Sequence, residues 1–338
     1  MTPADLLGGV ILAAAVLYAL LGGADFGAGI WDLLAGGPRK KEQRALIEEA
    51  IGPIWEANHV WLILIVVLLF TAFPPAFAAI TIALFVPLML LLVGIVLRGA
   101  AFTFRTYDAP EDRVQARWGL VFSGSSVVAP LTLGVIVGAL ASGNLGAAAR
   151  GEAPFAWAAP FPLAVGAFAA ALFAYVAAAY LAVEAGGALR EDFRRRAIGA
   201  GVAVFLTAAL SAALSWREAP LVFAGLTRRG WSIPLHLATG AAAITAFAAL
   251  YRGQVRLARA AAVAQVTLIV LGWGASQYPY LVVPDHTLAS ASAPRATQVP
   301  VLWALAAGAA LLFPALYLLF RVFKGERPFA ILDRDRPR

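Results

Sequence analysis

The chain has 338 residues, of which 62% are hydrophobic and only 13% are charged. A soluble domain carries about 25% charged residues, so this composition excludes a soluble globule. The absence of cysteine excludes disulfides, iron–sulfur clusters, thiolate-ligated haem and zinc–cysteine sites. Lys and Arg outnumber Asp and Glu by 26 to 19, an excess that membrane topology explains better than nucleic-acid binding does.

Nine apolar runs are long enough to cross a membrane. Transmembrane helices need about 20 apolar residues, whereas barrel strands have about 10 residues of alternating polarity. The runs have the helical length and are apolar on every face, so they predict helices. The predicted helices are 6–35, 51–73, 75–97, 118–141, 160–184, 197–216, 233–251, 257–278 and 300–322. A tight turn is expected at Pro74-Pro75, and the N-terminus lacks the basic region of a signal peptide.

The loops between these helices differ in positive charge. One set of loops, together with the C-terminal tail, holds 21 of the 26 Lys and Arg residues, and the other set holds 5. Because positively charged loops stay in the cytoplasm, the N-terminus is predicted outside and the C-terminus in the cytoplasm. That orientation needs an odd number of spans, in agreement with an all-α integral membrane protein of about nine helices.

A weak internal repeat relates the two halves of the chain. Asp25-Phe-Gly late in the first helix has a counterpart in Glu184-Ala-Gly late in the fifth. Arg98-Gly at the end of the third helix likewise matches Arg252-Gly at the end of the seventh, although chance pairs of this kind are common. The repeat predicts two four-helix bundles and a peripheral ninth helix. The expected divisions are 1–141, 142–278 and 279–338, the last containing an outer loop, the ninth helix and a basic cytoplasmic tail.

Asp25 lies in the first predicted helix between Gly23 and Gly27. A charged side chain in the bilayer costs roughly 2.5–3.5 kcal/mol, so it indicates either a function or a structural bond that offsets the cost. The two glycines form a GxxxG face that lets another helix approach closely, and Asp25, beside that face, is expected to point into a helix contact and not at lipid. Asp32, nearer the cytoplasmic interface, is expected to be solvated.

The second predicted helix opens with a polar segment that contains Trp55, Glu56, Asn58 and His59. Glu56 and His59 are three residues apart and are expected to share a helix face. A partly desolvated carboxylate near the cytoplasmic surface can bind and release protons, as a proton relay requires. Glu-x-x-His is also half of a di-iron signature, but neither of the other two histidines follows a glutamate at this spacing.

The histidines and Arg98 lie at different expected depths. His59 is expected near the cytoplasmic end, His236 near the outer end of the seventh helix, and His286 in an outer loop. The three therefore cannot meet at one haem iron, whereas these depths do not exclude a haem with a single histidine ligand. Arg98 ends the third helix on the cytoplasmic side, where it either pairs with a carboxylate or extends to the interface. No metal site is predicted.

Five motifs occur in order along the chain. They are GGADFGAGIW at 22–31, GPIWEANHVWLI at 52–63, FTAFPPAF at 70–77, LRGAAFTFR at 97–105 and SQYPYLVVPDHT at 276–287. Together they resemble subunit II of cytochrome bd-type quinol oxidases, most closely the cyanide-insensitive type. The N-terminal motifs are specific, and the middle third of the chain is only generically hydrophobic. Glu56 stands where the family can have aspartate, which keeps the chemistry.

The resemblance implies a complex that oxidises quinol and reduces dioxygen to water in the bacterial cytoplasmic (inner) membrane. Subunit I is the expected partner and the expected holder of the b- and d-type haems and of quinol, while this chain ligates no cofactor. A structural quinone, membrane lipids and small single-helix accessory subunits are further candidates, and nucleic acid is not. The resemblance also implies a cytoplasmic proton path, for which the candidates are Glu56, Asp25, His59, Asn58, Trp55 and Arg98.

Two other functions stay open. A proton-coupled secondary transporter would also contain buried acids, but it would place them in broken helices near mid-membrane, whereas these acids lie towards one side. A purely structural or assembly subunit would share the family and need no proton path.

Overall fold

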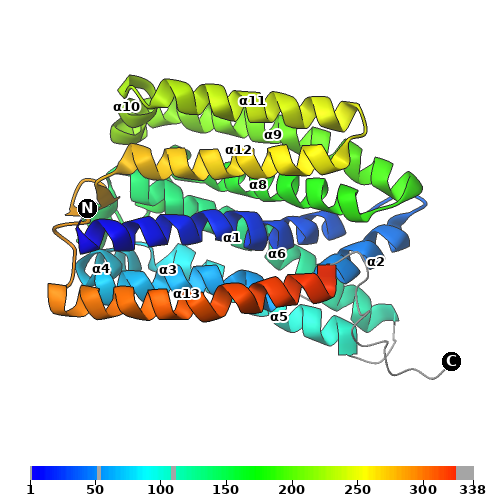
Figure 1. The fold of residues 1–338 in the computed structure, drawn as a ribbon, viewed down its shortest axis with the longest axis horizontal. Coiled ribbons are helices and arrows are strands. Elements are labelled where there is room, and N and C mark those ends of the chain that lie inside the picture. The colour runs from blue at the N-terminus through cyan, green and yellow to red at the C-terminus, as the bar shows by residue number, and fades with distance from the viewer. Residues whose placement is uncertain (1, 52–54, 108–111, 325–338) are drawn as a thin grey trace.

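The computed structural model describes residues 2–51, 55–107 and 112–324 (Figure 1). This part of the chain is almost entirely helical. Its elements are α1 (Pro3–Leu33), α2 (Lys40–Ile51), α3 (Trp55–Ala72), α4 (Pro74–Ala83), α5 (Phe85–Tyr107), α6 (Asp112–Ser142), α7 (Leu145–Ala149), η1 (Ala156–Ala158), α8 (Pro160–Glu184), α9 (Gly187–Glu218), α10 (Pro220–Arg228), α11 (Ser232–Tyr251), α12 (Val255–Gln277), β1 (Tyr280–Val282), β2 (His286–Thr287) and α13 (Arg295–Lys324). The predicted basic tail, 325–338, lies outside the described residues.

Among the described residues, eight helices are long and apolar enough to cross a membrane, and the count reaches nine if the bent pair α3 and α4 forms one span. The expectation of an all-helical protein with about nine spans is therefore confirmed. The predicted third helix, 75–97, is wrong in its bounds, because α4 ends at Ala83 and α5 carries the span on to Tyr107. In a continuous helix the ring of Pro87 would crowd the carbonyl group of Ala83 and residue 87 would have no N–H to donate to it, which favours a break there.

Figure 1 shows that the connections α1–α2, α8–α9 and α11–α12 all lie at one end of the bundle, on the right of that view, together with the C-terminal end of α5. We call this the basic end, and it includes residues 36–51, 185–196 and 252–256. The described loops that the sequence groups by positive charge, 36–51, 185–196 and 252–256, thus share one end. The compartment that this end faces stays a prediction.

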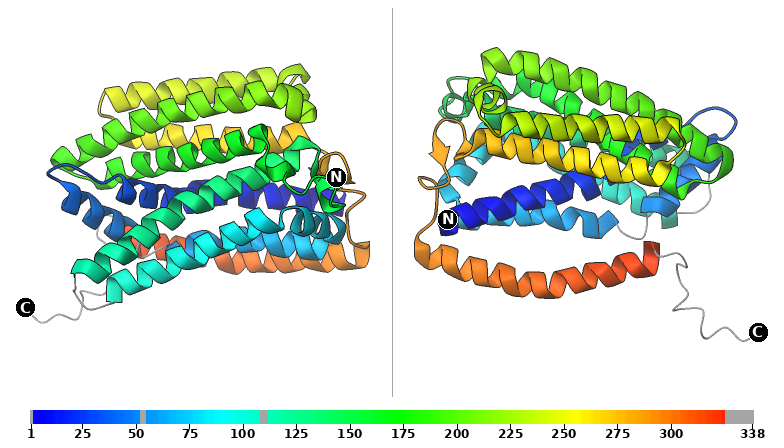
Figure 2. Two further views of the ribbon diagram at one scale, coloured as in Figure 1. Left: turned by 180° about the vertical axis from the view of Figure 1, so that it is seen from behind. Right: turned by 45° about the horizontal axis from the view of Figure 1, so that its top comes forward.

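Helix α1 lies in the middle of the bundle, where it contacts α3, α6, α8 and α12 (Figures 1 and 2). An added methyl group at Gly27 would overlap the backbone carbonyl of Phe173 on α8, and one at Gly23 would lie 2.7 Å from the ring of the same residue. The GxxxG face is therefore where α1 meets α8. Helix α13 runs along the outside, with none of its apolar window buried. The division into two four-helix bundles stays a prediction.

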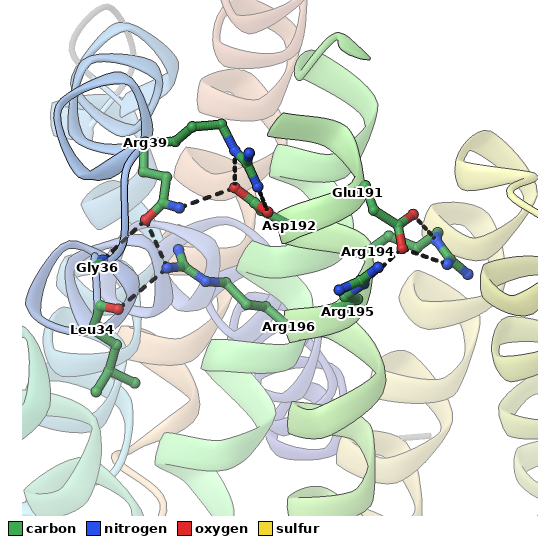
Figure 3. Close-up of polar contacts among 9 residues, drawn as sticks. Leu34, Gly36, Arg39, Glu191, Asp192, Arg194, Arg195 and Arg196 are labelled. Carbon is green, nitrogen blue, oxygen red and sulfur yellow. Dashed lines mark hydrogen bonds and ion pairs between the residues drawn. The ribbon is translucent and has the colours of Figure 1, made fainter. Parts of the chain in front are cut away.

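Polar side chains tie α2 and the end of α1 to α9 at the basic end (Figure 3). The guanidinium of Arg39 donates to both carboxylate oxygens of Asp192, and the amide of Gln43 donates to the same carboxylate at 3.0 Å. This carboxylate raises the pKa of Arg39 above its usual value. Arg196 donates to Gln43 at 2.8 Å and lies over the ring of Trp31. These contacts fix the position of α2 across the end of the bundle.

Candidate functional site

Asp25, late in α1, is buried with only 3% of its surface exposed. The amide of Asn58 on α3 donates a hydrogen bond of 2.8 Å to its carboxylate. A buried carboxylate is tolerated only where hydrogen bonds or opposite charge replace the lost water. The sequence expectation that Asp25 points into a helix contact agrees with this geometry.

Arg98 on α5 closes the other side of this cluster. Its guanidinium is 1% exposed, donates to the main-chain oxygen of Asp25 at 3.1 Å and donates to the hydroxyl of Ser126 at 3.2 Å. It also lies 5.1 Å from the ring centres of both Phe26 and Phe122, a cation–π arrangement. Arg98 therefore points into the bundle. Of its two expected roles, extension of the side chain to the membrane interface is wrong.

His59 belongs to an aromatic group beside the cluster. Its Nδ1 lies 3.4 Å from the hydroxyl of Tyr18, and its ring packs edge-on against Phe26 at 5.4 Å. Tyr18 lies seven residues before Asp25, and two turns of a helix bring such residues to one face. This spacing is the signal by which Tyr18 could have been found from the sequence.

Glu56 lies apart from this buried cluster. Its side chain is exposed in the first described turns of α3, on the helix face that also carries Ile63 and Phe70, each 61% exposed. The sequence predicts Glu56 and His59 on one face of the helix, but in the structure they point in different directions. The imidazole packs inward against aromatic rings, while the carboxylate is exposed. Trp55 begins α3, and its side chain lies outside the described part.

Asp32 is the clearest difference between expectation and structure. The sequence predicts a solvated side chain, but none of it is exposed. The hydroxyl of Ser123 on α6 donates to its carboxylate at 2.7 Å, and Nε of Arg44 on α2 lies 3.7 Å away. The sequence does not single out Ser123 and Ser126 as members of this polar group. Their signal is that small polar residues inside an apolar helix commonly mark a polar contact.

The three histidines lie on three different elements of the described ranges. His236 is on α11, where its Nδ1 contacts the main-chain oxygen of Ser232 at 2.6 Å. His286 is on β2 of the short hairpin, which like the first turn of α11 lies opposite the basic end (Figure 1). His59 is on α3, where its ring packs against the rings of Tyr18 and Phe26. No group of three or more His, Asp or Glu side chains within 2–51, 55–107 and 112–324 could hold a metal ion.

The family model for cytochrome bd terminal oxidase subunit II matches residues 4–323. The chain belongs to this family. The resemblance found in the five motifs is thereby confirmed, and the chain is a multi-pass protein of a bacterial inner membrane. The matched range takes in nearly all of the described residues, from the first turn of α1 to the last turn of α13.

Relatives in the cytochrome bd family share part or most of the chain. The cytochrome bd ubiquinol oxidase subunit 2 of Bacillus subtilis is 35% identical over 119 residues, which are 35% of this chain and 34% of that protein. The cytochrome bd-I ubiquinol oxidase subunit 2 of Escherichia coli is 33% identical over 138 residues, which are 41% of this chain and 35% of that protein. The chain thus spans about a third of the length of these curated relatives. A putative cytochrome bd menaquinol oxidase subunit II of Bacillus subtilis is 24% identical over 93% of both chains.

A solved structure shares the fold of the whole chain. The bd oxidase from Geobacillus thermodenitrificans contains a chain that superposes with a TM-score of 0.81 at 22% identity. The match covers 97% of this chain and 100% of that chain. The arrangement of helices around α1 is therefore that of a bd oxidase subunit.

Proposed function

We propose that this chain acts as subunit II of a complex that oxidises quinol and reduces dioxygen to water, and that it lines part of the proton path to that reaction. The observation that carries the proposal is the buried carboxylate of Asp25, held by Asn58 and adjoined by Arg98. Reduction of dioxygen to water consumes one proton for each electron, so protons must reach a buried reaction centre. A carboxylate in a polar cluster inside an apolar bundle can bind a proton and pass it on.

The second amide atom of Asn58 supports this role. Its Oδ1 is buried and has no hydrogen-bond partner within the residues that the structure describes. Because Nδ2 donates to Asp25, Oδ1 points away from that carboxylate and can accept a hydrogen bond from a water molecule. A buried polar atom of this kind commonly binds ordered water, and water beside Asp25 would deliver or remove its proton.

The proposed direction of the path follows from charge and exposure. The basic end is assigned to the cytoplasm, because positively charged loops are retained there. Glu56 lies near this end on an exposed apolar face, where a carboxylate facing lipid would be costly. We assign that face to subunit I, whose contact would cover Glu56 and let it act as a second proton-binding group. Trp55 and His59 remain candidates for the same path.

The haems are assigned to subunit I. The separation of His59, His236 and His286 among α3, α11 and the hairpin supports this assignment, because a b-type haem with two histidine ligands needs both at one iron. Quinol oxidation is assigned to subunit I as well. Small single-helix subunits, lipids and a structural quinone are proposed to meet the exposed faces of α5 and α13.

The proposal is tested in the complete purified complex with Asp25→Asn, which keeps the size of the side chain but removes its proton. We expect the absorption of b- and d-type haem to be retained and oxygen consumption with excess quinol to fall at least about tenfold. The matched control is Asp192→Asn, which alters a carboxylate bound by Arg39 on the surface of the basic end. Its rate should stay that of the unmodified complex.

Three outcomes separate the alternatives. An unchanged rate in Asp25→Asn with intact haem would remove Asp25 from the mechanism. A fall in rate that only follows a loss of haem would indicate the structural or assembly role. Purification of the chain as a stable protein without any haem-bearing partner would favour the secondary transporter.

A further inference from the structure

We propose that Asp32 is the proton-entry group of this path, placed between the cytoplasmic surface and Asp25. The inference rests on the proposed function, and it names a residue that the resemblance to the family does not assign. Its starting point is that Asp32 is completely buried although it lies in the last turn of α1, next to the basic end. A carboxylate that could have stayed in water has instead been enclosed by α2 and α6.

The spacing of Asp25 and Asp32 places both on one face of α1. Seven residues turn a helix by about 700°, so the two side chains differ by only about 20° and lie about 10 Å apart along the axis. Gly29 lies between them, and an added methyl group there would overlap the hydroxyl of Ser126. At Gly29 this face of α1 therefore carries no side chain and is covered by the hydroxyl of Ser126 on α6.

Two serines of α6 follow this face of α1. Ser123 and Ser126 are three residues apart, which puts them on one side of their helix. Ser123 donates to Asp32 at 2.7 Å, and Ser126 accepts from Arg98 at 3.2 Å. Arg98 in turn donates to the main-chain oxygen of Asp25. Polar side chains of α5 and α6 thus lie along the face of α1 that runs from Asp32 to Asp25.

The hydroxyl of Ser123 suits a neighbour that changes its protonation state. Its oxygen lies 2.7 Å from the carboxylate of Asp32 and 2.9 Å from the main-chain oxygen of Gly119. A hydroxyl has one hydrogen and can accept as well as donate. When Asp32 is ionised, the hydrogen can point to it; when Asp32 is protonated, the hydrogen can turn to Gly119 and the serine oxygen can accept from the carboxyl group.

Arg44 connects Asp32 to the surface. Its side chain is 34% exposed, and its Nε lies 3.7 Å from the carboxylate, beyond hydrogen-bond distance. A further nitrogen of the guanidinium donates to the main-chain oxygen of Asp32 at 3.4 Å. The cation of Arg44 therefore lies between solvent and the buried acid, beside the carboxylate that the proton would reach.

The test uses the complete complex with Asp32→Asn, Asp32→Glu and the control Glu152→Gln, which alters an exposed carboxylate bound by Arg150 outside the basic end. We expect the asparagine variant to keep its haems and its KM for quinol while kcat falls at least about tenfold, since only the proton-binding group is lost. The glutamate variant should recover most of that rate, which a loss of packing alone would not produce. The control should match the unmodified complex.

A normal kcat in Asp32→Asn with intact haem would overturn the inference, and so would an equal loss of rate in Asp32→Glu. If the asparagine variant fails to assemble, Ser123→Ala decides, because it keeps Asp32 and removes the hydroxyl that serves both protonation states. That variant should turn over severalfold more slowly, and a normal rate would again overturn the inference. A slow Asp25→Asn beside a normal Asp32→Asn leaves the proposed function standing, whereas normal rates in both remove it.

Discussion

The contact between α1 and α8 allows a stability prediction with a worked magnitude. In Gly27→Ala the added methyl group would overlap the carbonyl group of Phe173 and lie 2.7 Å from the side chain of Ala177. Overpacking of this kind costs about 1–3 kcal/mol, and the upper end, about 3 kcal/mol, applies here because the obstacle is backbone, which cannot rotate aside. Alanine regains about 0.5–1 kcal/mol of helix propensity, so the net loss should be about 2 kcal/mol. At about 2–4 °C per kcal/mol, the unfolding temperature should fall by several degrees.

The measurement is thermal unfolding of the detergent-purified complex, followed by tryptophan fluorescence. Gly9→Ala is the matched control, because Gly9 is on the same helix and a methyl group added there would have no atom within 4 Å. Gly23→Ala should fall between the two, since it meets only the ring of Phe173, which can shift. A Gly27→Ala complex that unfolds at the unmodified temperature, or a Gly9→Ala complex destabilised as much, would refute the packing argument.

Two further predictions concern the surface of the chain. Glu56→Leu in the assembled complex should slow oxygen reduction while haem content stays intact, and Ile63→Leu on the same exposed face is the control; equal rates in both would remove Glu56 from the mechanism. Arg39→Gln should lower the free energy of unfolding only slightly, because its ion pair with Asp192 is partly exposed, with side-chain exposures of 37% and 17%. Urea unfolding at low and high salt checks this, and a loss that does not shrink with salt would contradict the surface ion pair.

The apolar runs predicted most of the helices because a membrane span imposes length and composition together. They could not predict the break at Leu84, since Ala83, Leu84 and Phe85 are as apolar as the residues on either side. The proline at position 87 held that information, but prolines also occur inside continuous helices of this chain, as Pro130 does in α6. A proline at a helix break can be told from one inside a continuous helix only when the packing of α4, at the end opposite the basic end, is known.

The cost of burying charge made Asp25 and Arg98 visible as candidates, but it could not name their partners. The bond from Asn58 to Asp25 joins residues 33 apart, and the bond from Arg98 to Ser126 depends on how α5 and α6 are packed. The GxxxG pair predicted a close helix contact on general grounds. That the neighbour is Phe173, far along the chain on α8, follows only from the fold.

The burial of Asp32 could not be derived from its depth, because depth decides exposure only where nothing covers the end of a helix. Residues 40–50 fall in a predicted loop, yet they belong to the amphipathic helix α2, whose inward face includes Gln43 and Ile47 at 4% and 1% exposure. This helix lies across the basic end and brings Arg44 to Asp32. The charged segment that marks the side of the membrane thus also removes an acid from water, and an acid enclosed beside the surface is where a proton path into the bundle would begin.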